Sequence, residues 1–407
     1  MTTDTTTGTL VRLQPLTYVQ DGDEVMVGRP DTGSYGLFPP EGADLLRSLE
    51  TGVTLEAAAT RWHEQTGETL DTADFLDTLT ELGFVVGEGE ARAELPPVRW
   101  QRLGRALFSP VAWVLYAVAI AGGVAAMIGD PSLRPSYTNI FFTSHLALIP
   151  LVLALSQFPF VLLHEGFHAL AGRRLKLPSK LGIGRRLHYL VAETRMDSLY
   201  SVPRAKRYLP FVAGSLVDAV VLGVFTMLSA ASRHWGAPAW VSGLALALAF
   251  SAVLRILWEC LFYLETDFYF VIKTATGCAD LHGAAKSRVR SWVRKLLRRP
   301  PAAVSMEYSD HDLAAARWYA PLMVAGYGIS LGTLALVGVP TAVRFWTTVA
   351  HRLGNWQTQS TTTIIDTIAF VCLSGAELGL LGYVTIRDLR RRRAAKARSL
   401  ALEGKTS

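Results

Sequence analysis

Residues 160–174 read FVLLHEGFHALAGRR: two histidines and a glutamate interrupt an apolar run that ends in two arginines. His164, Glu165 and His168 have the spacing H-E-x-x-H. On a helix, residues i and i+4 lie on one face about 6 Å apart, so both imidazoles can reach one metal ion. The glutamate beside them can take a proton from water at such an ion. Unpaired, these groups are costly in lipid, and a metal ion explains their presence.

The chain around this stretch has the composition of a helical membrane protein. Half of its 407 residues are hydrophobic, and the mean hydropathy of +0.27 excludes an ordinary soluble protein. Six apolar runs are each long enough to cross a bilayer, which takes about 20 helical residues. They lie near residues 107–128, 141–172, 208–231, 239–263, 318–342 and 363–386. Gln157 and Pro159 interrupt the second run and predict a kink there.

Charge is divided unevenly along the chain. Residues 1–95 carry a net charge of −13 and the remainder carries +19. The basic residues flank apolar runs, which is typical of membrane-flanking charge and argues against nucleic acid as a partner. Six crossings with basic loops after the second and the fourth predict a multi-pass protein of the cell membrane with both termini in the cytoplasm.

The N-terminal part has the pattern of a small soluble domain. Two β-prone runs flank the turn Asp31-Thr32-Gly33 and predict a hairpin. Three helical patterns follow, with Thr54 and Asp71 as the expected N-caps of the second and third helices. A hairpin with three short helices predicts an α+β, winged-helix-like domain. We therefore divide the chain into this domain (8–88), a linker (89–106), a polytopic α-helical membrane domain (107–386) and a basic cytoplasmic tail (387–407).

A catalytic zinc ion needs a third protein ligand and keeps a fourth position for water. Asp267 is the best candidate, because it follows the fourth apolar run at its cytoplasmic end, at a depth that matches the two histidines. Glu259 and Glu265 are alternatives. Asp218, in the third run, is a further alternative, and we expect it to form a hydrogen bond to a ligand or between helices.

Two more charges lie inside apolar runs. Arg255 is in the fourth run and Glu377 is in the sixth. Charges in a membrane usually pair. We expect them to pair with each other or with Asp218 and so to anchor helices.

The segments HEGFHALAGRRL, VPRAKRYLPFVAGSLVD and ETDFYFVIKTATGCADL together resemble the site-2 protease family of intramembrane zinc metallopeptidases, and more closely its branch with a PqqD-like N-terminal domain. The resemblance covers 8–88 and about 107–386. It implies that Zn²⁺ is bound by His164, His168 and Asp267, with Glu165 as the catalytic base.

The chain departs from the family in two places. Its Leu-Asp-Gly motif stands here as Thr266-Asp267-Phe268, and its Asn-Pro pair is replaced by Leu261-Phe262, so an oxyanion-stabilising Asn is not visible. A β-prone stretch with Glu193 and Thr194 follows the second run. The resemblance implies a strand there that pairs with an extended substrate, and an ordinary cytoplasmic loop is the alternative.

The resemblance implies an intramembrane zinc metalloendopeptidase whose partners are the lipid bilayer and a peptide or membrane-protein substrate. Its N-terminal domain would recruit the precursor of a ribosomally made, modified peptide, and the acidic charge of that domain favours a basic partner or keeps it off anionic lipid. The alternative is a non-catalytic membrane zinc protein that binds or escorts such a peptide for export or immunity. A metal transporter is the third possibility, in which the motif glutamate has no obvious part.

Overall fold

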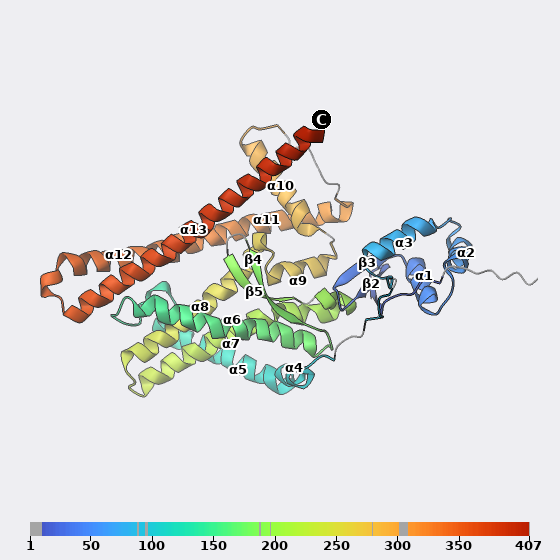
Figure 1. Cartoon of the computed structure of the whole chain (residues 1–407). Helices are drawn as coiled ribbons and strands as arrows, with labels where there is room; N and C mark the ends of the chain where they lie inside the picture. The colour runs from blue at the N-terminus through green and yellow to red at the C-terminus, as the bar shows by residue number, and fades with distance from the viewer. Residues whose placement is uncertain are drawn as a thin grey trace, which may run out of the picture.

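The computed structural model describes residues 10–87, 89–93, 97–186, 189–195, 197–278, 280–300 and 308–406 (Figure 1). The described chain is mostly helical, with a small antiparallel sheet in the N-terminal domain. In Figure 1 this domain lies at one end of the molecule, and the loop between α12 (Val339–Gly354) and α13 (Thr361–Thr406) lies at the other.

The N-terminal domain contains the predicted hairpin and the three predicted helices. The strands are β1 (Thr17–Asp21), β2 (Glu24–Arg29) and β3 (Ser34–Phe38), in the order β1-β2-β3. The helices are α1 (Pro40–Glu50), α2 (Leu55–Thr66) and α3 (Thr72–Glu81). Thr54 and Asp71 cap α2 and α3 as expected, because their side chains accept hydrogen bonds from first-turn N–H groups. Strand β1 was not predicted.

The two faces of this sheet have different roles. Side chains alternate between faces along a strand. Val25, Val27 and Phe38 belong to the core that the sheet forms with α1 to α3. Met26 and Leu37 are paired across β2 and β3, and their side chains lie on the opposite face of the sheet. That outer face is turned toward the membrane domain.

Six helices are long and apolar enough to cross a membrane, and each overlaps one of the predicted runs. The first four are α5 (Pro110–Gly129), α6 (Leu148–Arg173), α7 (Arg204–His234) and α8 (Ala239–Glu259). The fifth is continuous over Asp310–Gly354 through α11 (Asp310–Thr333), the π-helical η5 (Leu334–Gly338) and α12 (Val339–Gly354). The sixth is α13 (Thr361–Thr406).

Several boundaries differ from the prediction. Helix α6 begins at Leu148 rather than near 141 and continues through Pro159. The fifth crossing is 45 residues long, far beyond the predicted 318–342. The expected tail, 387–407, continues α13 up to Thr406. The expected linker, 89–106, is partly helical, because α4 (Gln101–Leu107) occupies its C-terminal end.

Shorter elements complete the membrane domain. Strands β4 (Lys180–Arg186) and β5 (Tyr189–Arg195) form an antiparallel hairpin after α6, so the β-prone stretch is a strand and not an irregular loop. Helices α9 (Asp267–Thr276) and α10 (Leu281–Leu296) follow α8. The single-turn 3₁₀ helices are η1 (Pro131–Leu133), η2 (Tyr137–Ile140), η3 (Asp197–Ser201), η4 (Phe262–Leu264) and η6 (Trp356–Thr358).

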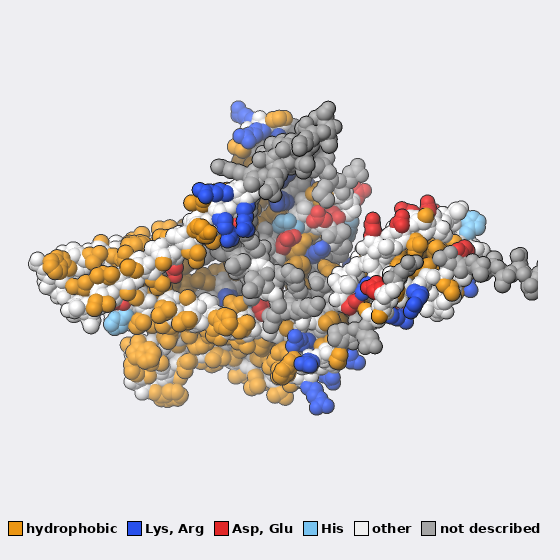
Figure 2. Space-filling model, in the orientation of Figure 1, with side chains coloured by type: hydrophobic (Ala, Val, Ile, Leu, Met, Phe, Trp, Pro, Cys, Tyr) orange, Lys and Arg blue, Asp and Glu red, His pale blue; other side chains and the backbone are white. Residues whose placement is uncertain are grey.

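Helix α7 is the centre of the bundle and packs against α5, α6 and α8. Its contact with α5 depends on Gly223, where an added Cβ would come closer than 3.0 Å to the backbone of Ala119. Small residues at helix interfaces allow such a close approach in membranes. Figure 2 shows hydrophobic side chains over the outer surface of the bundle and of the α11–α13 arm, and Lys and Arg gathered toward the end near the N-terminal domain.

Candidate metal centre

His164 and His168 meet Asp267 in the interior of the bundle. The histidines lie one turn apart on α6, and Asp267 is the first residue of α9. Asp267 Oδ2 lies 3.4 Å from His164 Nε2 and 2.7 Å from His168 Nε2. The three candidate ligand atoms all lie within 4.8 Å of one another. Two imidazole nitrogens and one carboxylate oxygen are a donor set that zinc accepts.

The turn after α8 positions Asp267. Glu265 adopts a left-handed conformation with φ of 53°, and the buried Thr266 is then the N-cap of α9. Thr266 Oγ1 donates to the Glu259 carbonyl at 2.6 Å, and the Asp267 backbone N–H donates to Glu259 Oε2 at 2.9 Å. A carboxylate at a helix N-terminus is stabilised by the N–H groups that point at it. Glu259 thus holds the backbone of Asp267 and is not part of the ligand set.

Hydrogen bonds on the far side of each ring fix the orientation of the histidines. His168 Nδ1 lies 2.6 Å from the Pro210 carbonyl, and His164 Nδ1 lies 2.8 Å from Asp218 Oδ2. A carbonyl can only accept, so His168 carries a proton on Nδ1, and Nε2 is the ring nitrogen that could bind a metal ion. Such partners orient metal-binding histidines in proteins.

A chain of buried polar groups extends from His164. Asp218 Oδ1 accepts a hydrogen bond from Arg255 Nε at 2.7 Å, and Arg255 Nη1 donates to Gln157 Oε1 at 3.0 Å. The chain runs from α6 through α7 and α8 back to α6, so it fixes the two motif histidines against the bundle. The predicted pairing of Arg255 with Asp218 is confirmed. Glu377 is exposed on α13 and forms no ion pair among the described residues.

Gly214 leaves room between the two imidazoles. A Cβ added to this residue of α7 would lie less than 3.0 Å from Nε2 of both His164 and His168. In addition, His168 Nε2 is buried and has no hydrogen-bond partner of suitable geometry among the described residues. Without a side chain at Gly214, helix α7 does not obstruct the Nε2 atoms of the two rings, which a shared metal ion would have to reach.

The surroundings favour an ionised Asp267. Burial by itself would raise the pKa of this carboxyl group, but the adjacent His168 and His164 hold the pKa of Asp267 below its usual range. The ionised form is the one that a metal ion requires. Glu265, the other predicted alternative, has a half-exposed side chain that faces His282 at 4.0 Å, outside this cluster.

Glu165 and β5 lie next to the cluster. Glu165 is buried on α6 between the two histidines, and its carbonyl accepts a hydrogen bond from Thr194 Oγ1 at 2.9 Å. This bond attaches β5 to the motif. The side chain of Glu193 lies outside the described residues.

Sequence reasoning missed the contributions of α7. Pro210 and Gly214 were not singled out, and Gln157 was interpreted only as an interruption of its helix. One signal was present: Gly214 lies four residues before Asp218, so a residue without a side chain and a carboxylate share one face of a helix. The chain matches no protein-family model, no curated protein and no solved structure. Its function therefore has to be inferred from the site itself.

Proposed function

We propose that this chain is a membrane-spanning zinc metalloendopeptidase that resembles the site-2 protease family and cleaves a peptide or a membrane protein. The observation that carries the proposal is the convergence of the buried His164 and His168 with the partly buried Asp267, and the buried Glu165 lies on the helix of the two histidines. When bound, a zinc ion would polarise the scissile carbonyl and lower the pKa of a water ligand.

The residues of the chain have separate tasks in this reaction. Glu165 would act as general base toward the attacking water and then return the proton to the leaving amine nitrogen. Asp218 and the Pro210 carbonyl keep the two imidazoles aligned, and Glu259 keeps Asp267 in place. The burial of the cluster keeps bulk water away from it.

The position and free edge of strand β5 favour a peptide as the substrate. It is paired with β4 on one side, and no strand pairs with its other side among the described residues. An extended substrate could add to that side by main-chain hydrogen bonds. Since Thr194 attaches β5 to the carbonyl of Glu165, such a substrate would lie beside the general base.

The location and the partner follow from the same proposal. Six helices that could span a membrane support a location in the cell membrane, and the basic segments that flank them support cytoplasmic termini. The N-terminal domain would be a PqqD-like, winged-helix-like unit that recruits the precursor of a ribosomally made, modified peptide.

Replacement of Glu165 by glutamine tests the proposal. Glu165→Gln keeps size but removes the base, so the purified protein should retain its zinc and its fold. Cleavage should fall by at least about 10²-fold, the low end of general-base contributions. Mass spectrometry of peptides from cells that make the modified peptide should show uncut precursor with Glu165→Gln. The control is Glu377→Gln, which changes an exposed glutamate in another apolar helix and should give the normal product.

A second function is favoured by one observation. The position where an Asn-Pro pair would supply an oxyanion donor holds Leu261 and Phe262, and the Phe262 carbonyl accepts a hydrogen bond from Tyr319 at 2.9 Å. A non-catalytic zinc protein that binds or escorts a peptide needs no such donor. Unchanged peptide maturation in cells with Glu165→Gln would reject the peptidase and support this function.

A further inference from the structure

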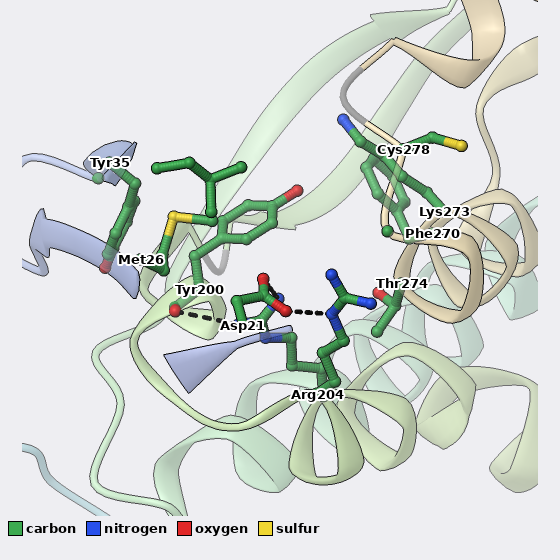
Figure 3. A pocket seen from close by; sticks show the side chains of 13 residues that line it. Asp21, Met26, Tyr35, Tyr200, Arg204, Phe270, Lys273, Thr274 and Cys278 are labelled. Carbon is green, nitrogen blue, oxygen red and sulfur yellow. Dashed lines mark hydrogen bonds and ion pairs between the residues drawn. The ribbon is translucent and has the colours of Figure 1, made fainter. Parts of the chain in front are cut away.

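A pocket of about 370 Å³ lies where the outer face of the N-terminal sheet meets α7 and α9. Figure 3 shows Tyr35, Met26 and Tyr200 on one side and Phe270, Lys273 and Cys278 on the other, with Asp21 and Arg204 between them. The pocket therefore takes its walls from two domains.

Asp21 fixes these walls to each other. This carboxylate at the end of β1 is buried, and it accepts hydrogen bonds from Arg204 Nε and, at 3.3 Å, from Arg207 Nη1. Arg207 also donates to the carbonyls of Val202 and Tyr200, at 2.8 and 3.3 Å. A charged group held by several partners keeps one position, so the pocket has a defined shape.

The pocket has an excess of positive charge. Three cationic side chains, Arg204, Arg207 and Lys273, line it against the single carboxylate of Asp21. Burial raises the pKa of the Cys278 thiol, so this residue stays neutral and adds no negative charge. Within the described part of the chain, no residue forms an ion pair or a hydrogen bond with the Lys273 ammonium. The positive charge of the pocket is opposite in sign to the net charge of −13 on residues 1–95.

The remaining surface of the pocket is apolar. Met26 and Leu37 come from the sheet, and Phe270 comes from α9. A ligand that fits both features has an anionic group on an apolar or extended body. A carboxylate also suits the fork of an arginine and the ammonium of a lysine, both of which form charge-assisted hydrogen bonds with it.

Helix α9 connects this pocket to the metal centre. Asp267 begins the helix and Lys273 follows six residues later, about 9 Å along the axis. Between them, Phe270 stacks on Phe211 with ring centroids 5.5 Å apart. Phe211 directly follows Pro210, whose carbonyl orients His168. An extended peptide advances about 3.3 Å per residue, so about three residues cover this distance.

We propose that this pocket is a substrate subsite that binds an acidic side chain of a peptide, about three residues from the bond that lies at the metal centre. This inference rests on the proposed function and adds a substrate class to it. The acidic N-terminal domain as a whole disfavours acidic peptides, so selection would come from this local positive site.

Binding to full-length protein tests the subsite without any cleavage. The protein carries Glu165→Gln in phosphatidylcholine nanodiscs, and the probes are fluorescein-labelled ten-residue peptides of Ala, Leu and Thr with one central Glu, Gln or Lys. Fluorescence anisotropy should show that the Glu peptide binds at least about tenfold more tightly than the Gln peptide, as one charge-assisted pair allows. Equal affinities would overturn the proposal.

Charge reversal in the pocket gives the matched comparison. Lys273→Glu should reverse the preference toward the Lys peptide. Lys206→Glu, on the exposed face of α7 and outside the pocket, should keep the preference for Glu. A preference for Glu that survives Lys273→Glu would reject the site. Loss of the Glu preference when phosphatidylglycerol replaces phosphatidylcholine would assign the pocket to a lipid headgroup instead.

The two proposals fail in different ways. Cells with Glu165→Gln could mature their peptides normally while the purified protein still shows the charge preference and its reversal. This result would support the acidic subsite and reject the peptidase function. If cleavage depends on Glu165 and the charge preference is missing, the peptidase function is supported and the acidic subsite is rejected.

Discussion

Replacing Gly214 by alanine should abolish metal binding while the bundle stays folded. The added methyl carbon would lie less than 3.0 Å from Nε2 of both His164 and His168, whereas ordinary contacts of such an atom are 3.4–4 Å. Zinc–nitrogen distances are about 2.0–2.1 Å, so a metal ion needs the space next to these two atoms. The methyl group and the ion therefore compete for the same region.

The histidines cannot easily move away from the methyl group. His168 is held by the Pro210 carbonyl at 2.6 Å, and His164 is held by Asp218 at 2.8 Å. Forcing an extra methyl group into a packed interior costs about 1–3 kcal/mol. Replacing glycine by alanine inside a helix stabilises the helix by up to about 1 kcal/mol. The net loss in the free energy of unfolding, about 0–3 kcal/mol, leaves the protein folded.

The effect on the metal should be much larger than the effect on stability. Changes to groups that only orient a ligand lower metal affinity by about 10–100-fold, and Gly214→Ala obstructs both imidazoles directly. We expect a decrease of more than about 100-fold. Plasma mass spectrometry gives the zinc content of purified protein, and thermal unfolding confirms that the variant is folded.

Gly166→Ala is the matched control, because Gly166 lies inside the same motif and an added Cβ there meets no atom within 4 Å. This variant should bind zinc like the wild type. A full equivalent of zinc in Gly214→Ala, with Gly166→Ala also unaffected, would show that the space between the imidazoles is not the metal site.

Three further predictions concern other parts of the chain. Asp218→Asn leaves the Arg255 guanidinium without its carboxylate and should lower both the melting temperature and, by about 10–100-fold, the zinc affinity; an unchanged zinc titration would contradict this. Asp21→Asn should release the N-terminal domain, so that limited trypsin digestion between the domains becomes faster, and an unaltered rate would mean that this ion pair does not hold the domain. With the native cysteines replaced, a cysteine at Ala237 should react with a membrane-impermeant maleimide from outside the cell and one at Lys206 should not, and the reverse pattern would overturn the topology.

The architecture could be predicted largely because its signals are local. An apolar run identifies a helix in a membrane from its own residues, and a capping residue such as Thr54 or Asp71 acts on the N–H groups that follow it. The lengths were less predictable. Polar residues extend α11 and α13 at their ends, and hydropathy alone does not show where such a helix stops.

The site was predictable to the extent that its residues follow a motif. The spacing of His164 and His168 specifies a shared helix face, but no local pattern specifies which carboxylate meets them. Glu259 and Asp267 are eight residues apart, and the turn between them places one in the cluster and makes the other its support. This turn depends on the left-handed conformation of Glu265, which the sequence does not predict because non-glycine residues rarely adopt it.

One face of α7 connects the contact with the N-terminal domain to the candidate metal centre. Arg207, Pro210, Gly214 and Asp218 follow one another at intervals of three or four residues, which places them on one face of the helix. The first holds Asp21 of the N-terminal domain, and the other three orient or make room for the histidines. From Arg207 to Asp218 the helix rises about 16 Å. Because a packed helix keeps this distance constant, a peptide held at the domain junction would reach the metal centre in a fixed register, and the position of the acidic residue would then determine which bond is cut.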